Sequence, residues 1–338
     1  MTHLFAHPLI VKPNHQITDY KWLLYAINSP NFRNQVDSHS TGSVQKVVNT
    51  TALAQFFILT PPLPEQKSIA SILSALDDKI ELNLQTNRTL EEMAMALYKH
   101  WFVDFGPFQN GKFVDSELGS IPEGWGIKSI EELSERVGMG PFGSNIKVST
   151  FVETGVPIIS GQHLQSILVQ DKIGHNFVTP EHAQKLSKSI VSAGDVIFTH
   201  AGNIGQVSML TNQNRYKEYI LSQRQFFCRP NPNKIAAEIV LQYFRTTSGI
   251  HELLKHSSST GVPSISRPVT NLRLVEIVVP AIHVQVNYVQ LITPLFSQIK
   301  SNEEEIEQLT ALRDTLLPKL ISGEVRVKDV EQTIAKAL

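Results

Sequence analysis

A heptad pattern between residues 65 and 101 constrains the fold of this chain more than any other feature. Side chains recur there at alternating steps of four and three residues, the spacing of the a and d positions in a coiled coil. Prolines bound the stretch on both sides, so it can form one helix of roughly 55 Å. Such a helix is too long for a compact domain and predicts a spacer with a partner helix. The seam consists of Ile69, Leu73, Leu76, Ile80, Asn83, Asn87, Leu90, Ala94, Leu97 and Trp101.

The predicted partner helix lies in the same chain, 219 positions further on. At this offset the sequence aligns with itself without a gap and places Gln66 on Gln285. An ungapped repeat of this length predicts two copies of one unit, each an α/β globule followed by a long helix. We expect the helices to pair antiparallel, with the equivalent residues Asn83 and Asn302 close together to set the register. The second seam consists of Tyr288, Ile292, Leu295, Ile299, Asn302, Ile306, Leu309, Arg313, Leu316 and Leu320.

The repeat predicts an α+β fold in which mainly β globules with some helix are separated by long antiparallel coiled-coil helices. The second globule begins near Leu118, about a hundred residues before the position that aligns with Met1. We therefore expect the first globule to lack its first half. The expected segments are the C-terminal part of the first globule (1–62), the first spacer helix (63–106), the second globule (107–282), the second spacer helix (283–325) and a charged tail (326–338).

Some local features are also predicted. Residues 53–59 are apolar and should form a buried strand that delivers the chain to the first spacer helix. Residues 192–210 should form a β-hairpin around an Ala-Gly-Asn turn. Pro294 should kink the second helix or set its start, and Pro318 should mark its end.

Composition and motifs argue against catalysis by this chain. Cys228 is the only cysteine, which excludes a disulfide framework and a cysteine-rich zinc site. Residues 138–143 satisfy G-x-G-x-x-G but lack the preceding strand and following helix of a dinucleotide site. No apolar run reaches the length of a membrane span and no charged head with an apolar core begins the chain, so a cytoplasmic protein is expected. We interpret the sequence as non-catalytic, without a metal or cofactor of its own.

The sequence does predict a binding surface on the second globule. The chain has a net charge of −1, but residues 125–270 contain fourteen Lys or Arg and ten Asp or Glu. In the major groove Arg pairs with guanine and Asn or Gln with adenine, whereas Lys and Ser suit phosphates. Polar loops are also common because water solvates them, so composition alone decides little. The candidate DNA-binding residues are Ser144, Asn145, Lys147, Gln162, His163, His200, Asn203, Gln223, Arg224 and Gln225.

Several segments together resemble the specificity (S) subunit of Type I restriction-modification enzymes, over nearly the whole chain. They read PPLPEQKSIASILSALDDKIELN, EEMAMALYKHWFVDF, LGSIPEGW, GDVIFTHAGNIGQV and LLPKLISGEV. The resemblance implies two target-recognition domains, each reading half of a split double-stranded DNA target. It also implies a non-catalytic subunit that presents DNA to methyltransferase (M) subunits and through them to restriction (R) subunits. S-adenosylmethionine, ATP and Mg²⁺ are then expected on those partners.

Within this resemblance, apolar side chains on the spacer helices become candidates for docking the M subunits. Local core packing is the alternative for the same side chains. The candidates are Tyr98, Trp101, Phe102 and Phe105 with the first helix, and Leu316, Leu317, Leu320 and Ile321 with the second.

Several outcomes stay open for a chain with one complete recognition domain, at about residues 121–280. It could read one half-site, be completed by a separate chain or a second S chain, or be an inactive remnant. A coiled-coil scaffold that binds protein, or an enzyme with an unrecognised site, are further classes. Salt-insensitive association without DNA retention would indicate the scaffold, and S-adenosylmethionine binding by the isolated chain would indicate the enzyme.

Overall fold

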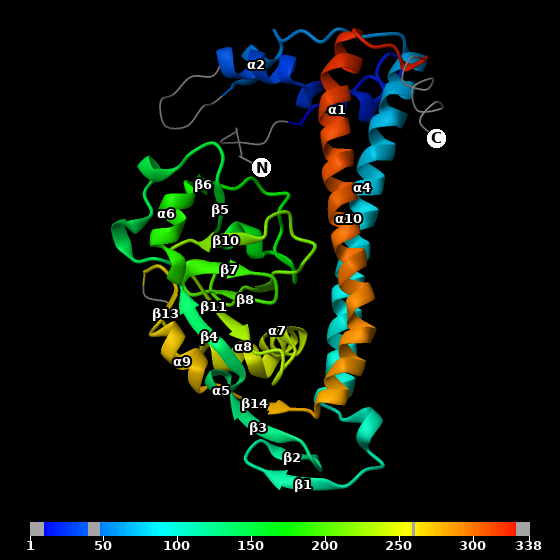
Figure 1. Ribbon diagram of the computed structural model, residues 1–338. Helices are drawn as coiled ribbons and strands as arrows, with labels where there is room; N and C mark the ends of the chain where they lie inside the picture. The colour runs from blue at the N-terminus through cyan, green and yellow to red at the C-terminus, as the bar shows by residue number, and fades with distance from the viewer. Residues whose placement is uncertain (1–9, 40–47, 259–260, 329–338) are drawn as a thin grey trace. The chain divides into compact units, whose positions relative to one another are not determined.

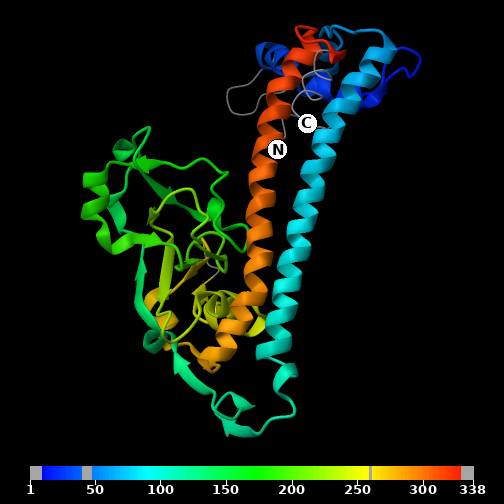
Figure 2. The ribbon, with the colours of Figure 1, turned by 45° about the vertical axis from the view of Figure 1, so that its right-hand side comes forward.

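The computed structural model describes residues 10–39, 48–258 and 261–328. They form two compact units, the first combining residues up to 85 with those from 304 onward, and the second comprising residues 86–303. Two long helices contribute to both units, α4 (Leu63–Phe102) and α10 (Ile282–Ser322). They lie side by side in both views (Figure 1, Figure 2). The long helices predicted from the heptad pattern are therefore present.

The two long helices pair antiparallel within each unit. In the first unit, Asn83 Nδ2 donates to Glu305 Oε2 at 2.8 Å. In the second unit, Asn302 Nδ2 donates to Asn87 Oδ1 at 2.7 Å. Residue numbers rise along α4 as their partners' numbers fall along α10, which defines the antiparallel direction. Asn83 and Asn302 are both buried, as seam positions should be, but they bond to these partners instead of to each other.

Helix α10 continues through both of its prolines. Pro294 was expected to kink the helix or mark its start and Pro318 to mark its end, yet the helix extends from residue 282 to residue 322. Both predicted boundaries are therefore wrong. A proline in a helix interior removes one hydrogen bond, and packing offsets that loss here, because Ile292 and Leu320 next to the two prolines are buried.

The first unit places short helices against the ends of the long pair. Asp19 caps the first of them, since its carboxylate accepts a hydrogen bond from Trp22 N at 2.9 Å. The short helices are α1 (Tyr20–Asn28), α2 (Pro30–His39) and α3 (Thr50–Leu53). The buried core of this unit consists of Trp22, Ala26, Ile69, Ala70, Leu73, Leu320 and Ile321.

The predicted buried strand at residues 53–59 is wrong. Leu53 ends α3, and Phe57 and Leu59 are 85% and 71% exposed. In the second unit the equivalent segment is strand β14 (Glu276–Val279), which pairs with β3 (Gly126–Ser129). Among the described residues, this segment pairs with no strand. A strand of this kind is stabilised by its neighbour and does not form from its apolar pattern alone.

The internal repeat is visible in one joint that occurs in both units. Gln66 and Gln285, which align at the offset of 219, are 0% and 3% exposed. Each side chain bonds main-chain atoms only, which ties the start of a long helix to the globule before it. The bonds of Gln66 involve Asp19 N (2.8 Å), Ile17 O (2.9 Å) and Pro61 O (2.8 Å), and those of Gln285 involve Ala236 N (2.8 Å), Lys234 O (3.1 Å) and Pro280 O (2.9 Å).

The second unit contains two four-stranded sheets. One has the antiparallel order β4-β11-β8-β9, and the other has the order β6-β5-β10-β7, in which β10 runs parallel to β5. The pairing of β8 with β9 confirms the predicted hairpin. The strands are β4 (Ser134–Met139), β5 (Val156–Ile159), β6 (Phe177–Val178), β7 (Ile190–Ser192), β8 (Val196–Thr199), β9 (Val207–Met209), β10 (Glu218–Leu221) and β11 (Gln225–Pro230).

Smaller elements complete the second unit, whose described residues also pair β1 with β2 and β12 with β13. These strands are β1 (Phe113–Ser116), β2 (Gly119–Pro122), β12 (Ser257–Ser258) and β13 (Ser264–Ile265). The helices are α5 (Ile130–Leu133), α6 (Pro180–Lys185), α7 (Ala237–Arg245), α8 (Thr247–Leu254) and α9 (Pro268–Leu274). The fold is α+β, as predicted.

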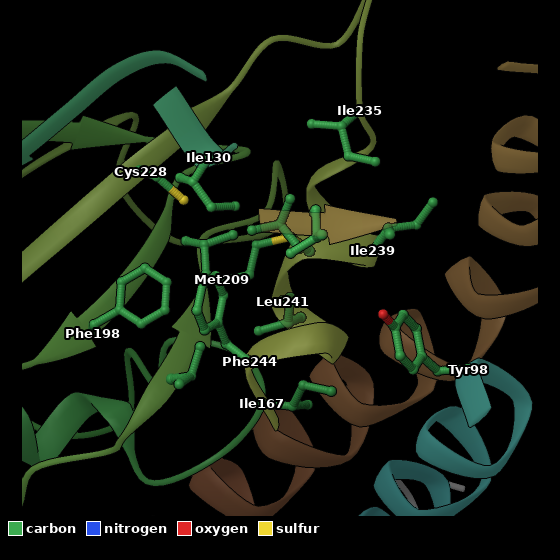
Figure 3. Packing of buried hydrophobic residues seen from close by; sticks show 14 of the residues in the cluster. Tyr98, Ile130, Ile167, Phe198, Met209, Cys228, Ile235, Ile239, Leu241 and Phe244 are labelled. Atoms are coloured by element: carbon green, nitrogen blue, oxygen red, sulfur yellow. The ribbon is translucent and has the colours of Figure 1, made fainter. Parts of the chain in front are cut away.

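The main core of the second unit lies between the β4-β11-β8-β9 sheet, α7 and the long helices (Figure 3). Phe198 packs against Phe244 edge to face, with ring centroids 5.0 Å apart. Cys228 belongs to this core and is fully buried, and burial raises the pKa of its thiol. No helix in the described part of the chain combines the length and apolar character that a membrane span requires.

Candidate nucleic-acid interface

A polar cavity of about 550 Å³ opens on the second unit. Strands β5, β8 and β10 each end at its wall, so three loops supply most of its side chains. We call it the recognition cavity. Its lining consists of Ser160, Gly161, Gln162, Gln165, Thr199, Ala201, Gly202, Asn203, Gln206, Ser222, Arg224 and Gln225.

Hydrogen bonds hold the amide groups in this cavity. Thr199 Oγ1 donates to Gln206 Oε1, and Gln206 Nε2 donates to Gly161 O, both at 3.0 Å. Ser222 Oγ donates to Gln225 Oε1. A Cβ on Gly161 would lie 3.1 Å from Gln206 Oε1, so glycine permits the close approach. These mutual bonds orient the polar groups before any ligand binds.

A neighbouring loop, residues 140–146, is fastened to the turn at residues 222–225. We call it the clamped loop. Gln223 Nε2 donates to two of its carbonyl oxygens, at 2.7 and 3.1 Å. The His182 Nε2 atom lies 2.8 Å from a third carbonyl oxygen of the loop. A Cβ on Gly140 would lie 1.8 Å from a carbonyl oxygen of the turn, so glycine is required there.

The exposed cationic side chains near the cavity form no ion pairs among the described residues, whereas a more buried arginine in the same unit does. Arg229 forms a two-pronged ion pair with Asp195, with both contacts at 2.7 Å. Burial of Asp195 raises the pKa of its carboxyl, although Arg229 acts in the opposite direction. Among the described residues, Lys147 and Arg224 form no ion pair, and both are exposed. Their charges are therefore available to an anionic ligand.

The structure gathers many of the candidate residues at this site. Gln162, Asn203, Arg224 and Gln225 line the recognition cavity, although Gln225 is only 1% exposed. The others lie near its rim or on the adjoining loop: the His200 Nε2 atom is 3.0 Å from Gln223 O, Asn145 belongs to the clamped loop, and Lys147 follows it. The side chain of Ser144 lies outside the described part of the structure.

Sequence reasoning missed five polar side chains that line the cavity, those of Ser160, Gln165, Thr199, Gln206 and Ser222. Thr199 and Gln206 flank the predicted hairpin turn, where a polar residue at the end of each strand was the available signal. Gln165 stands two residues beyond the candidate His163 and carried no separate signal.

The structure corrects the placement of His163. Its side chain is 1% exposed and stacks on His175, with ring centroids 4.2 Å apart. Burial, helped by His175, lowers the pKa of His163 to about 4. A neutral ring inside the domain cannot contact DNA from this position. The sequence did not distinguish it from the exposed Gln162 beside it, because both stand in a polar turn.

The candidate docking residues on the first spacer helix pack into the second unit. Tyr98 and Phe102 are 5% and 7% exposed, and their rings contact the ring of Tyr288. Trp101 and Phe105 are half-buried. For Tyr98 and Phe102 the structure therefore shows the alternative, local packing, and a buried ring cannot itself be a contact surface.

The candidates on the second spacer helix likewise pack inside the first unit. Leu320 and Ile321 are buried in its core, and Leu316 and Leu317 are half-buried against it. Docking of M subunits at either set stays a prediction. No group of three or more potential metal ligands occurs among the residues that the structure describes.

The fold and site define a binding protein in which a polar cavity sits on an α+β domain joined to a long helix pair. The sequence profile of the Type I restriction modification DNA specificity domain matches residues 2–92 and 122–311. The two matched segments end 219 positions apart, which is the offset of the internal repeat. The chain belongs to this family.

Individual relatives agree with this assignment. The Type I restriction enzyme MjaIX specificity subunit of Methanocaldococcus jannaschii is 26% identical over 329 residues, covering 92% of this chain and 70% of the relative. The HindI specificity subunit of Haemophilus influenzae is 23% identical, covering 94% of this chain and 80% of the relative. The crystal structure of the Type I system S subunit from M. genitalium matches with a TM-score of 0.52 at 17% identity, covering 91% and 74% of the two chains, which supports the fold alone.

Proposed function

We propose that this chain is the non-catalytic DNA specificity subunit of a Type I restriction-modification system. The proposal is carried by one observation, the convergence of the exposed residues Gln162, Asn203 and Arg224 on one polar cavity. Amide side chains can bind adenine and a guanidinium can bind guanine through paired hydrogen bonds in the major groove. Membership of a DNA specificity family supports assigning this role to the cavity.

The same proposal names the partners. The chain binds one part of a split double-stranded DNA target and docks M subunits, and R subunits join through M. Those partner subunits, and not this chain, bind S-adenosylmethionine, ATP and Mg²⁺. A second S chain supplies further recognition where two half-sites are read. The proposed site of action is the cytoplasm.

Selection of duplexes from a random pool tests this function. The wild-type chain with its cognate M subunit should enrich a short motif, and Arg224→Ala should lose preference at one base pair by about 5- to 150-fold. Arg224→Lys should restore the charge but only part of the preference, because an ammonium on a flexible stem lacks the rigid planar fork of a guanidinium.

Lys147→Ala is the matched comparison for Arg224→Ala. A phosphate contact carries no sequence information, so this variant should weaken all duplexes alike and lower the slope of log affinity against log salt by about one. An unchanged enriched motif with Arg224→Ala would contradict base reading in the cavity. A wild-type chain that enriches no motif and associates with protein at any salt concentration would favour the scaffold.

The paired helices are proposed to set the distance between half-sites. Deleting residues 79–85 and 304–310 removes one heptad from each helix and keeps the seam nearly in phase. Because a heptad spans roughly 10 Å and a base pair about 3.4 Å, the preferred gap should shorten by about three base pairs. The measurement is the gap in selected duplexes that contain two motifs, and an unchanged gap would contradict the proposal.

A further inference from the structure

Phe142 on the clamped loop has its aromatic ring in solvent. Its side chain is 73% exposed, and among the described residues it makes no contact with another ring. It stands between Pro141, whose backbone φ is restricted, and Gly143, whose φ is +54°. Single exposed aromatic rings are common on protein surfaces, so the significance of Phe142 depends on how its loop is held and on the side chains near it.

The backbone on both sides of Phe142 is fixed. On one side, Gly140 lies so close to the turn at residues 222–225 that its N–H donates to Gln225 O at 2.8 Å. On the other side, Gln223 Nε2 bonds the carbonyl oxygens of Gly143 and Ile146. The ring therefore projects from a fastened segment, which lowers the entropy lost when it binds.

The surroundings of Phe142 indicate what it contacts. Gln223, which fastens the loop, is followed directly by Arg224 in the wall of the recognition cavity. Lys147 stands just beyond the loop, exposed and without an ion pair among the described residues. A loop that carries an exposed aromatic ring and adjoins free cations and amide groups matches stacked bases flanked by phosphates better than it matches an apolar protein surface.

We propose that Phe142 is an intercalating residue, which inserts between two adjacent base pairs beside the bases read in the recognition cavity. The inference rests on the proposed DNA-binding function. Insertion of an apolar side chain between base pairs partly unstacks that step and bends the duplex. Pyrimidine–purine steps unstack most easily, so Phe142 adds a preference for such a step at a position that no polar group reads.

The test uses the full chain and the duplex that it enriches from a random pool, labelled at both ends for energy transfer. Wild type should bend this duplex, whereas Phe142→Ala should leave it straight and weaken binding by about 10- to 100-fold. Phe142→Trp should keep the bend, since a larger ring still inserts. The slope of log affinity against log salt should not change with Phe142→Ala, because Phe142 neutralises no phosphate.

Phe57→Ala is the matched control, since Phe57 is also a solvent-exposed phenylalanine but belongs to the first unit. It should leave affinity and bend unchanged. If wild type and Phe142→Ala bend the duplex equally and bind it with equal affinity, the proposed intercalation by Phe142 is wrong. The proposed sequence selection by the cavity would be unaffected. A wild-type chain that enriches no duplex would overturn the proposed function and the intercalation together, so the two failures can be told apart.

Discussion

Replacing Asp171 with alanine should lower the free energy of unfolding of the second unit by about 3–5 kcal/mol, because it leaves buried partners unpaired. Asp171 Oδ2 accepts hydrogen bonds from Asn214 Nδ2 at 2.7 Å and from Arg215 N at 3.0 Å. Its Oδ1 accepts from the Tyr219 hydroxyl at 2.6 Å. Lys300 Nζ on α10 lies 3.9 Å from the same carboxylate. The carboxylate thus joins the cavity-bearing domain to its long helix.

The effect of Asp171 should depend on pH. Burial opposes the charged form, but His175, Tyr219 and the Arg215 N–H outweigh it and lower the pKa of this carboxyl from its usual 3.8. A lowered pKa gives stabilisation that is fully present above 3.8 and is lost as the pH falls through the folded-state value. The difference between wild type and Asp171→Ala should therefore be largest near neutral pH and shrink in acid.

Urea unfolding followed by tryptophan fluorescence measures this effect, since two of the three tryptophans, Trp101 and Trp125, lie in the second unit. Asp171→Asn is the control of similar shape: it keeps the volume but loses the charge, so it should show the same pH trend. A stability difference that stays constant from neutral pH to acid would contradict the ionic origin of the effect.

Replacing Trp22 with alanine should destabilise the first unit by about 3–5 kcal/mol, the usual cost of removing a buried aromatic side chain. Trp22 is 1% exposed in a small core, so few other contacts can compensate. Hydrogen exchange should show faster exchange in α1 and the adjoining turns of α4, with protection retained in β8 and β11 of the second unit.

Trp22→Phe is the matched control for this substitution. Among the described residues Trp22 Nε1 has no hydrogen-bond partner, so phenylalanine loses packing volume but no hydrogen bond. We expect a smaller loss of stability than for alanine. Equal loss of protection in both units after Trp22→Ala would show that they do not unfold separately.

The sequence predicted those parts of the fold that depend on local periodicity. The seam through Leu73 and Ile299 required a long helix in each copy, and both helices formed. The segment at residues 53–59 failed because a strand depends on a neighbour that periodicity cannot supply. The asparagine partners were also missed, because a one-turn shift in helix pairing changes which residues meet without changing the pattern.

At the candidate site, the sequence indicated which side chains can form hydrogen bonds but not which of them are exposed. Gln162, Asn203 and Arg224 were recognisable as hydrogen-bonding groups in loops, and they converge on one cavity. His163 had the same chemistry but points into the domain, and no local pattern distinguishes it. Phe142 was not among the candidate residues, because an aromatic residue next to a glycine is equally consistent with a core position and a surface position.

The joint made by Gln66 and Gln285 has a consequence for how such chains diversify. All six of its contacts are with peptide N–H and C=O groups, which nearly every residue type supplies. The globule can therefore change its side chains freely without loosening its attachment to the helix. Because the two glutamines bond only peptide groups, globules with different side chains can be attached to the same long helices in the same way.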